Sequence, residues 1–404
     1  MNVTTSGLLL DGPNAVKPKV KINVRSKKIK SQCYLCGEAT STLDEANQTI
    51  FPFITGSSGV LSFNSEAGKP EKICWKCSFL GKFVPVNGFY LSQDDHLYVF
   101  LPYSPSLEKM CDVYDTLQDA KYNDPNLLRN FDHPLGVYFQ HPFEVTFAFF
   151  YTLYDKLSIR QTGKSEGEVE LNLDAILDLT VDKAPLEFVV VHTKNEGSTF
   201  SGKMIWPFKE TVYFYKLIQQ IEKRTRVKMK EPLYYLIGFT ETKNENKTLL
   251  RNRVCERILK KQTILDLVEQ HVFHTKLDYF KPLFDMLLTY ELLIKGENKV
   301  YKEEQEVAVN LGRRIGMAVA KSDNGKKGDL FALRKTRRKV DFLEQLNRLQ
   351  FKLGSDFVVP SDVYEGKLTD DNFQEFKQFC MIAALNSYNY VKSGEKTNKK
   401  GEDK

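Results

Sequence analysis

Four cysteines in two close pairs carry the clearest chemical signal in this 404-residue chain. They stand as Cys33-x-x-Cys36, followed by Gly37, and as Cys74-x-x-Cys77. A two-residue spacer lets both thiolates of a pair reach one ion, and two such pairs supply the four sulfurs of a closed, tetrahedral zinc site. The glycine suits a tight turn that directs backbone N–H groups at the sulfurs. The spacing therefore predicts a structural Zn²⁺ bound by all four cysteines.

Two other uses of these cysteines stay open. Four thiolates can also hold an iron–sulfur cluster. A redox Cys-x-x-Cys would need one pair on a βαβ unit, and the second pair would then have no explanation. Bound metal would contribute folding energy, because the segment 31–80 is short and polar. The total of seven cysteines is odd, which fits thiols and metal ligands in a reducing, cytoplasmic compartment.

No motif predicts catalysis. Gly163-Lys164-Ser165 resembles the end of a phosphate-binding loop, but Ser158 stands where that loop requires glycine. His271 and His274 lie close together without an acidic partner at metalloprotease spacing, so hydrogen-bonded histidines at the surface are the favoured interpretation. A two-metal nuclease site assembled from distant carboxylates stays open. We expect a protein that is not an enzyme.

Positive charge is concentrated in two segments of a chain whose net charge is +6. Residues 11–30 hold seven basic residues and one acid, and residues 321–339 hold eight basic residues and two acids. Such segments are typical of polyanion contact, although a solvated surface explains each one alone. The candidate nucleic-acid contacts are Lys19, Lys21, Arg25, Lys27, Lys28, Lys30, Arg313, Arg314, Lys326, Lys327, Arg334, Arg337 and Arg338. Within a helix, the last three would share one face and could follow a phosphate backbone.

The elements around these residues predict an α+β fold. Residues 1–272 are expected to form a mixed amino-terminal domain with the four-cysteine zinc knuckle, 31–80, inserted in it. A hairpin is predicted over 86–101, and period-two patterns predict strands at Glu168–Leu173, Leu186–His192 and Lys203–Phe208. Residues 143–157 are so rich in aromatic side chains that periodicity does not separate a buried strand from a helix.

The carboxy-terminal part is predicted to be entirely helical. Apolar residues recur at helical spacing in Leu277–Ile294, Glu304–Lys321 and Val340–Leu353, and Thr369 is a suitable N-cap for a last helix. We expect a helical bundle over 273–391 and a disordered, Lys-rich tail over 392–404. No run of eighteen apolar residues occurs and Met1–Leu10 lacks a basic stretch before its leucines, so neither a membrane span nor a secretory signal is expected.

The order of these features resembles a known family. A basic start is followed by Cys-x-x-Cys-Gly, a long spacer and a second Cys-x-x-Cys; later come Leu311-Gly312-Arg313-Arg314-Ile315-Gly316 and Leu330-Phe331-Ala332-Leu333-Arg334. This order is similar to the CXXC–CXXC subgroup of large subunits of type I-B Cascade, the CRISPR surveillance complex. The likeness covers the cysteine pairs and the last hundred residues, whereas residues 100–270 match only in general character.

The resemblance implies a ribonucleoprotein subunit without catalytic activity. Such large subunits lie near the 5′ end of the guide CRISPR RNA, inspect double-stranded target DNA for a short flanking motif, and hold the displaced single strand. They contact backbone and small subunits and dock a helicase–nuclease or a transposition protein, while base pairing to the guide reads the sequence. By this likeness the Lys19–Lys30 arm would contact guide-RNA or DNA phosphates, and the basic residues of the bundle would contact a DNA strand. A free-standing zinc-containing DNA-binding or repair protein explains the cysteines and the charge equally well.

Overall fold

A computed structural model gives the fold and describes residues 2–4, 7–9, 31–40, 43–45, 72–81, 88–93, 95–111, 141–162, 186–196, 199–236, 245–275 and 277–402. These residues combine helices with a small antiparallel sheet, which confirms the predicted mixture of α and β structure in its general form. The chain forms two compact units, Met1–Tyr215 and Lys216–Lys404. Residue 272, where the sequence placed the end of the amino-terminal domain, lies within the second of these units.

A four-stranded sheet organises the first unit. Its strands are β7 (Phe89–Gln93), β8 (His96–Tyr103), β9 (Glu187–Glu196) and β10 (Thr199–Phe208), and they pair in the order β10-β9-β8-β7 with every neighbour antiparallel. The hairpin and the two later strands are thus confirmed, whereas Glu168–Leu173 lies outside the described residues. The remaining pairs are short: β1 (Asn2–Thr4) with β2 (Gly7–Leu9), β3 (Ser31–Gln32) with β4 (Ala39–Thr40), and β5 (Leu43–Glu45) with β6 (Lys72–Cys74).

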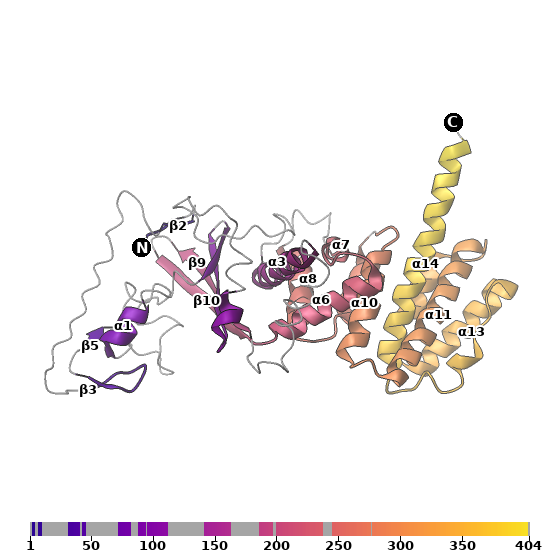
Figure 1. The fold of residues 1–404 in the computed structure, drawn as a ribbon. Coiled ribbons are helices and arrows are strands. Elements are labelled where there is room, and N and C mark those ends of the chain that lie inside the picture. The colour runs from indigo at the N-terminus through magenta and orange to yellow at the C-terminus, as the bar shows by residue number, and fades with distance from the viewer. Residues whose placement is uncertain are drawn as a thin grey trace. The chain divides into compact units, whose positions relative to one another are not determined.

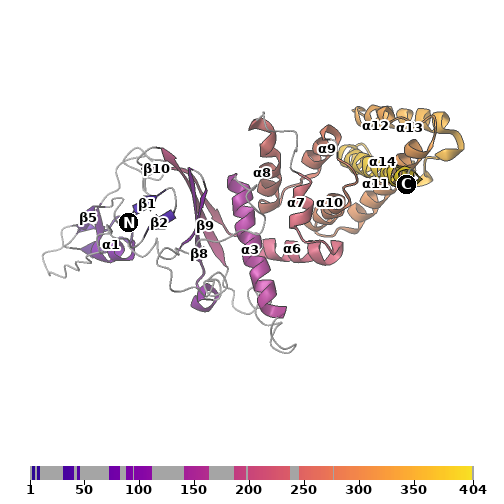
Figure 2. The ribbon, with the colours of Figure 1, turned by 90° about the horizontal axis from the view of Figure 1, so that it is seen from above.

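The segment that the sequence left undecided between strand and helix is the helix α3 (Pro142–Thr162), which runs beside the sheet in Figure 2. Its aromatic side chains pack on one face of the strands. Phe149 stacks on Phe100 with 4.0 Å between ring centroids, and Phe150 meets Phe188 edge-on at 5.2 Å. Burying such large rings between a helix and a sheet is a major stabilising contribution, on the order of 1.5–3 kcal/mol for each side chain.

The second unit is built from helices, and the residues described in it include no strand. Figure 1 shows α10, α11, α13 and α14 as its orange and yellow part. The helices, from the one that crosses the boundary onward, are α6 (Thr211–Thr225), α7 (Lys230–Tyr234), α8 (Glu245–Leu259), α9 (Leu265–His274), α10 (Lys281–Ile294), α11 (Lys299–Lys321), α12 (Lys327–Arg334), α13 (Lys339–Leu353) and α14 (Phe373–Glu402), with 3₁₀ turns η2 (Gly354–Asp356) and η3 (Ser361–Val363).

Helix α14 begins at Phe373, and Thr369 makes the hydrogen bonds of the predicted cap in the turn just before it. The Asn372 N–H donates to the Thr369 hydroxyl at 3.2 Å, and the Thr369 N–H donates to Asn372 Oδ1 at 2.9 Å. The helix extends to Glu402, so the backbone of 392–402 continues the helix where the sequence predicted a disordered tail.

Helices α11 and α14 approach each other closely at two glycines. A Cβ atom at Gly312 would overlap the carbonyl oxygen of Cys380, and one at Gly316 would overlap that of Ala384. Small residues at four-residue spacing remove the side chains that otherwise keep helix backbones apart. None of the described helices combines the length and the apolar character needed to cross a membrane.

Candidate metal centre and nucleic-acid interface

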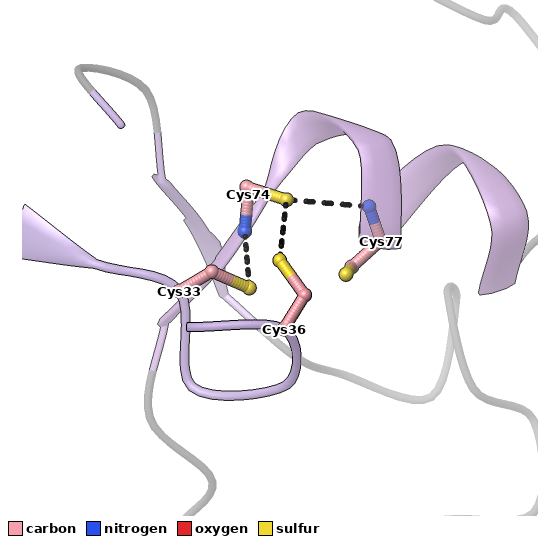
Figure 3. A group of neighbouring side chains, drawn as sticks. All are labelled: Cys33, Cys36, Cys74 and Cys77. Carbon is pink, nitrogen blue, oxygen red and sulfur yellow. Dashed lines mark hydrogen bonds between the residues drawn. The ribbon is translucent and has the colours of Figure 1, made fainter. Parts of the chain in front are cut away.

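The four predicted cysteines come together from two short pieces of backbone. Cys33 and Cys36 flank the turn that joins β3 to β4, where Gly37 has φ +71° and its N–H donates to the Cys33 carbonyl at 2.9 Å. Cys74 ends β6, and Cys77 lies in the first turn of helix α1 (Trp75–Gly81), which begins directly after that strand. The tight turn predicted at the glycine is thus confirmed, and Figure 3 shows the four side chains converging.

The distances fit one tetrahedral ion. All four sulfurs lie within 4.8 Å of one another, and the Sγ atoms of Cys36 and Cys74 are 3.7 Å apart. Four Zn–S bonds of about 2.3 Å at tetrahedral angles would place the sulfurs about 3.8 Å apart. Cys33 and Cys74 are buried, whereas Cys36 is exposed. The cluster is therefore compatible with a metal site in which two ligands are buried in the protein and one faces solvent.

Backbone N–H groups donate hydrogen bonds to two of these sulfurs, and such bonds stabilise the thiolate form. The Cys74 N–H donates to the Cys33 sulfur at 3.2 Å, and the Cys77 N–H donates to the Cys74 sulfur at 3.5 Å. Burial opposes ionisation of Cys33, but N–H donors from Cys36, Cys74 and Leu35 outweigh it and lower its pKa to about 6. Burial, and hydrogen bonds with neighbouring sulfurs, raise the pKa of Cys77. A divalent cation would remove the repulsion that otherwise prevents all four thiols from ionising.

Four of the predicted basic contacts of the second unit are exposed. Arg313 and Arg314 are exposed on α11, and Lys326 and Lys327 are exposed where α12 begins. Within the described part of the chain, no ion pair joins any of these four residues to an acid. They therefore remain available to contact an anion.

The prediction that Arg334, Arg337 and Arg338 share a helix face is wrong. Helix α12 ends at Arg334, and the next two arginines lie in the connection to α13. Arg338 pairs with Asp341 at 2.7 Å, while Arg337 is exposed. These three side chains consequently do not lie along one helix face that could follow a phosphate backbone.

Arg334 packs against side chains of helix α9. Its guanidinium makes two hydrogen bonds to the Glu269 carboxylate, at 2.6 and 3.1 Å, and its Cζ lies 4.8 Å from the centroid of the Phe273 ring. Both pairing side chains are mostly buried. A bidentate pair of this kind ties α12 to α9, and the contact of Arg334 with nucleic acid stays a prediction.

The amino-terminal candidates Lys19, Lys21, Arg25, Lys27, Lys28 and Lys30 lie outside the described residues. Their predicted contact with phosphates therefore stays a prediction.

Three of the described histidines, His96, His192 and His271, make side-chain hydrogen bonds. His271 is buried rather than at the surface, and its Nε2 lies 2.7 Å from the Tyr235 carbonyl oxygen. His96 and His192, far apart in the sequence, face each other across β8 and β9 with 2.7 Å between Nδ1 and Nε2. Burial lowers the pKa of His192 to about 4. Each of these contacts is a satisfied hydrogen bond, which gives no sign of a second metal centre among the described residues.

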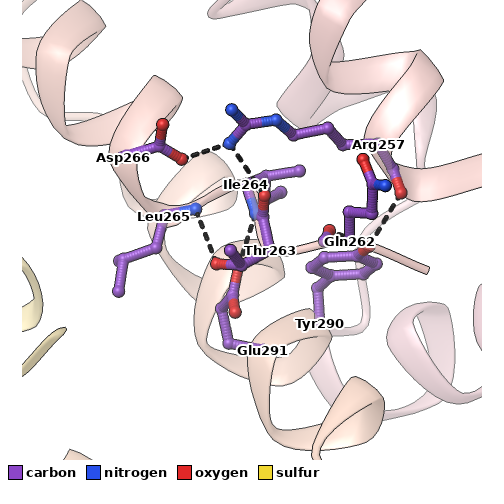
Figure 4. A network of polar contacts seen from close by, with 8 residues as sticks. All are labelled: Arg257, Gln262, Thr263, Ile264, Leu265, Asp266, Tyr290 and Glu291. Atoms are coloured by element: carbon purple, nitrogen blue, oxygen red, sulfur yellow. Dashed lines mark hydrogen bonds and ion pairs between the residues drawn. The ribbon is translucent and has the colours of Figure 1, made fainter. Parts of the chain in front are cut away.

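One buried carboxylate gave no signal in the sequence. Glu291 on α10 is fully buried, and its Oε1 accepts from the Ile264 N–H at 2.8 Å and the Thr263 hydroxyl at 3.0 Å (Figure 4). Its Oε2 has no hydrogen-bond partner among the described residues. Burial raises the pKa of Glu291 to about 7. The side chain thus caps α9 from a neighbouring helix, and its charge state changes near neutral pH.

Comparison with known proteins adds no relative: no protein-family model matches the chain, and no curated protein matches its sequence.

Proposed function

We propose that the chain is a zinc-stabilised nucleic-acid-binding subunit, without catalytic activity, of a CRISPR RNA-guided DNA surveillance complex. Within it, Cys33, Cys36, Cys74 and Cys77 hold Zn²⁺, which pins the short elements β3 to β6 and α1. The observation that supports zinc is the 4.8 Å cluster of four sulfurs, two of which receive backbone N–H donors.

Nucleic-acid binding is supported by charge. Exposed cations on α11 and at the start of α12 lie without an acid partner in the described part of the molecule. Phosphate contacts from such residues hold a strand in place without reading its bases. The more specific assignment, to the large subunit of a type I-B complex, rests on the order of motifs in the sequence. In that role the chain contacts the guide RNA, the target duplex and the displaced strand, and it docks a helicase–nuclease or a transposition protein.

Metal analysis tests the zinc site. The purified chain should carry one zinc ion, and Cys33→Ser or Cys74→Ser should lose it because three sulfurs no longer close the site. Cys111→Ser is the matched control, since this exposed cysteine lies outside the cluster, and it should keep the metal. Iron in place of zinc, or equal zinc content in all variants, would contradict the assignment.

Purification from the native host tests the function. A tagged full-length chain should copurify with the other subunits and with a repeat-derived guide RNA, identified by sequencing. Recovery of the chain without RNA, but with affinity for DNA, would identify the free-standing DNA-binding alternative. Metal-dependent cleavage of DNA by the purified chain alone would overturn the assignment of a subunit without catalysis.

A further inference from the structure

A surface hollow lies between α11 and the residues that follow α13. Its volume is about 390 Å³, and it is lined by Arg314, Met317, Ala318, Lys321, Asp356, Phe357 and Val358. The four residues from α11 are spaced at i, i+3, i+4 and i+7, which places them on one face of the helix. The other three come from the end of η2 and the extended residues after it. The volume falls in the range of small-ligand sites.

The two cations of the hollow differ from several other cations of the same unit that are held in ion pairs. Lys352 binds Asp329, Lys367 binds Glu303 and Arg338 binds Asp341. Arg314 and Lys321 are exposed two helical turns apart, and no ion pair occupies either of them among the described residues. They form a positive edge on which an anion can replace water without breaking an existing pair.

The rest of the lining is apolar with one acid. Met317 is 42% exposed and Val358 is 62% exposed, although both are large hydrophobic side chains. Such side chains gain stability when a flat apolar surface covers them. Asp356 is exposed at the end of η2, and its carboxylate can only accept hydrogen bonds while it is ionised.

We propose that this hollow binds one nucleotide of a single-stranded nucleic acid. The phosphate lies on Arg314 and Lys321, and the base packs on Met317 and Val358. Asp356 accepts a hydrogen bond from an exocyclic amino group, which cytosine, adenine and guanine have and thymine lacks. An acidic peptide would also satisfy the cations, but it carries no base to pack on Met317 and Val358. This inference rests on the proposed nucleic-acid binding and assigns it a subsite.

Fluorescence anisotropy with labelled oligonucleotides, about twelve nucleotides long to span one binding site, tests the subsite on the full chain. Wild type should bind oligo(dC) about five- to tenfold more tightly than oligo(dT), the range of one amino-group contact. Arg314→Ala combined with Lys321→Ala should weaken binding of both strands about tenfold, because the variant cannot make two of the phosphate contacts. Asp356→Ala should remove the preference for oligo(dC) while leaving affinity for oligo(dT) unchanged or higher.

A control variant and the contrary outcomes separate this inference from the proposed function. Arg348→Ala removes an exposed cation that pairs with Glu344 outside the hollow, and it should leave binding unchanged. Thermal melting should show that all variants stay folded, because every replaced side chain is exposed. If the wild type binds the strands and none of the hollow variants changes that binding, the proposed subsite is wrong and nucleic-acid binding still stands. Tighter binding of a poly-glutamate peptide than of the strands would also overturn it. Failure of the wild type to bind any strand would overturn both.

Discussion

At the scale of single residues, the buried Glu291 has the clearest consequence for stability. Its folded-state pKa of about 7 lies above the ordinary value of 4.5. Between these two values the folded chain holds a proton that the unfolded chain has released, so stability decreases as pH rises through this window. Glu375 raises this pKa further and Lys295 lowers it, and both are smaller effects than burial.

Replacing the carboxylate with an amide tests this coupling. Glu291→Gln cannot ionise and can still accept the hydrogen bonds from Ile264 and Thr263. We expect its free energy of unfolding to exceed that of wild type near pH 8, by on the order of 1–3 kcal/mol, and the difference to vanish at about pH 4.5. Urea unfolding followed by far-UV circular dichroism at several pH values measures it. A difference in the free energy of unfolding that stays constant with pH would contradict the raised pKa of Glu291.

Arg334 provides a second prediction at this scale. Arg334→Ala leaves the Glu269 carboxylate, only 11% exposed, without its partner and removes the contact with the Phe273 ring. We expect it to destabilise the helical unit by about 1–3 kcal/mol, less than a fully buried pair because the site is partly solvated. Arg337→Ala is the matched control, since that side chain is exposed, and it should change stability by less than about 0.5 kcal/mol. Equal melting of the two variants would show that the pair with Glu269 contributes little.

At the scale of elements, the close packing of α11 against α14 depends on glycines, which have no side chain to hold the two backbones apart. Gly312→Ala would drive a methyl group into the Cys380 carbonyl oxygen, and the nearest side-chain atom, Ala383 Cβ, would lie only 2.8 Å away. Because backbone cannot rotate away as a side chain does, we expect destabilisation by about 1–3 kcal/mol. Thermal unfolding measures it.

Gly328 in α12 is the control for this substitution. A Cβ there meets nothing within 4 Å, so Gly328→Ala should leave stability unchanged or raise it by about 0.4–1 kcal/mol, through a less flexible unfolded chain. If both glycine variants melted alike, close packing at Gly312 would not explain the first result.

The periodicity of apolar residues in the sequence predicted some of the helices and strands but not others. The strands around Val190 and the helix containing Leu311 have clear periodicity, and both occur where expected. In α3, aromatic side chains such as Phe147, Phe149 and Phe150 are all buried, so no polar face marks the helical period. The end of α12 at Arg334 was not predictable, because the residues after it include no glycine or proline to mark a helix end.

The candidate metal centre was predictable because its ligands come in two local pairs with a characteristic spacing. The hollow on α11 and the cap made by Glu291 were not. Asp356 lies 42 residues after Arg314, and Glu291 lies 27 residues after Ile264, so only the packing of helices brings them together. The pairing of Arg334 with Glu269 was not predictable for the same reason, since Glu269 precedes it by 65 residues.

At the scale of the whole molecule, the candidate metal centre and the exposed cations belong to different parts of the chain. The four-cysteine cluster lies in the first compact unit, and the exposed cations of α11 and α12 lie in the second. Each unit has its own packed interior, so loss of metal should affect the first unit before the second. Limited proteolysis of Cys33→Ser should therefore cut first within the unit Met1–Tyr215 while the helical unit stays protected. Simultaneous digestion of both units would contradict this independence.

The central claim is that exposed cations of the helical unit bind a phosphate backbone. Its most direct test is the association constant of the full chain for single-stranded DNA, measured over a range of salt concentrations. For wild type, log K should fall linearly with log salt, and Arg313→Glu with Arg314→Glu should reduce the slope by about 0.7 for each phosphate that the variant no longer neutralises. An affinity that does not depend on salt, or a slope that the double reversal leaves unchanged, would contradict the account.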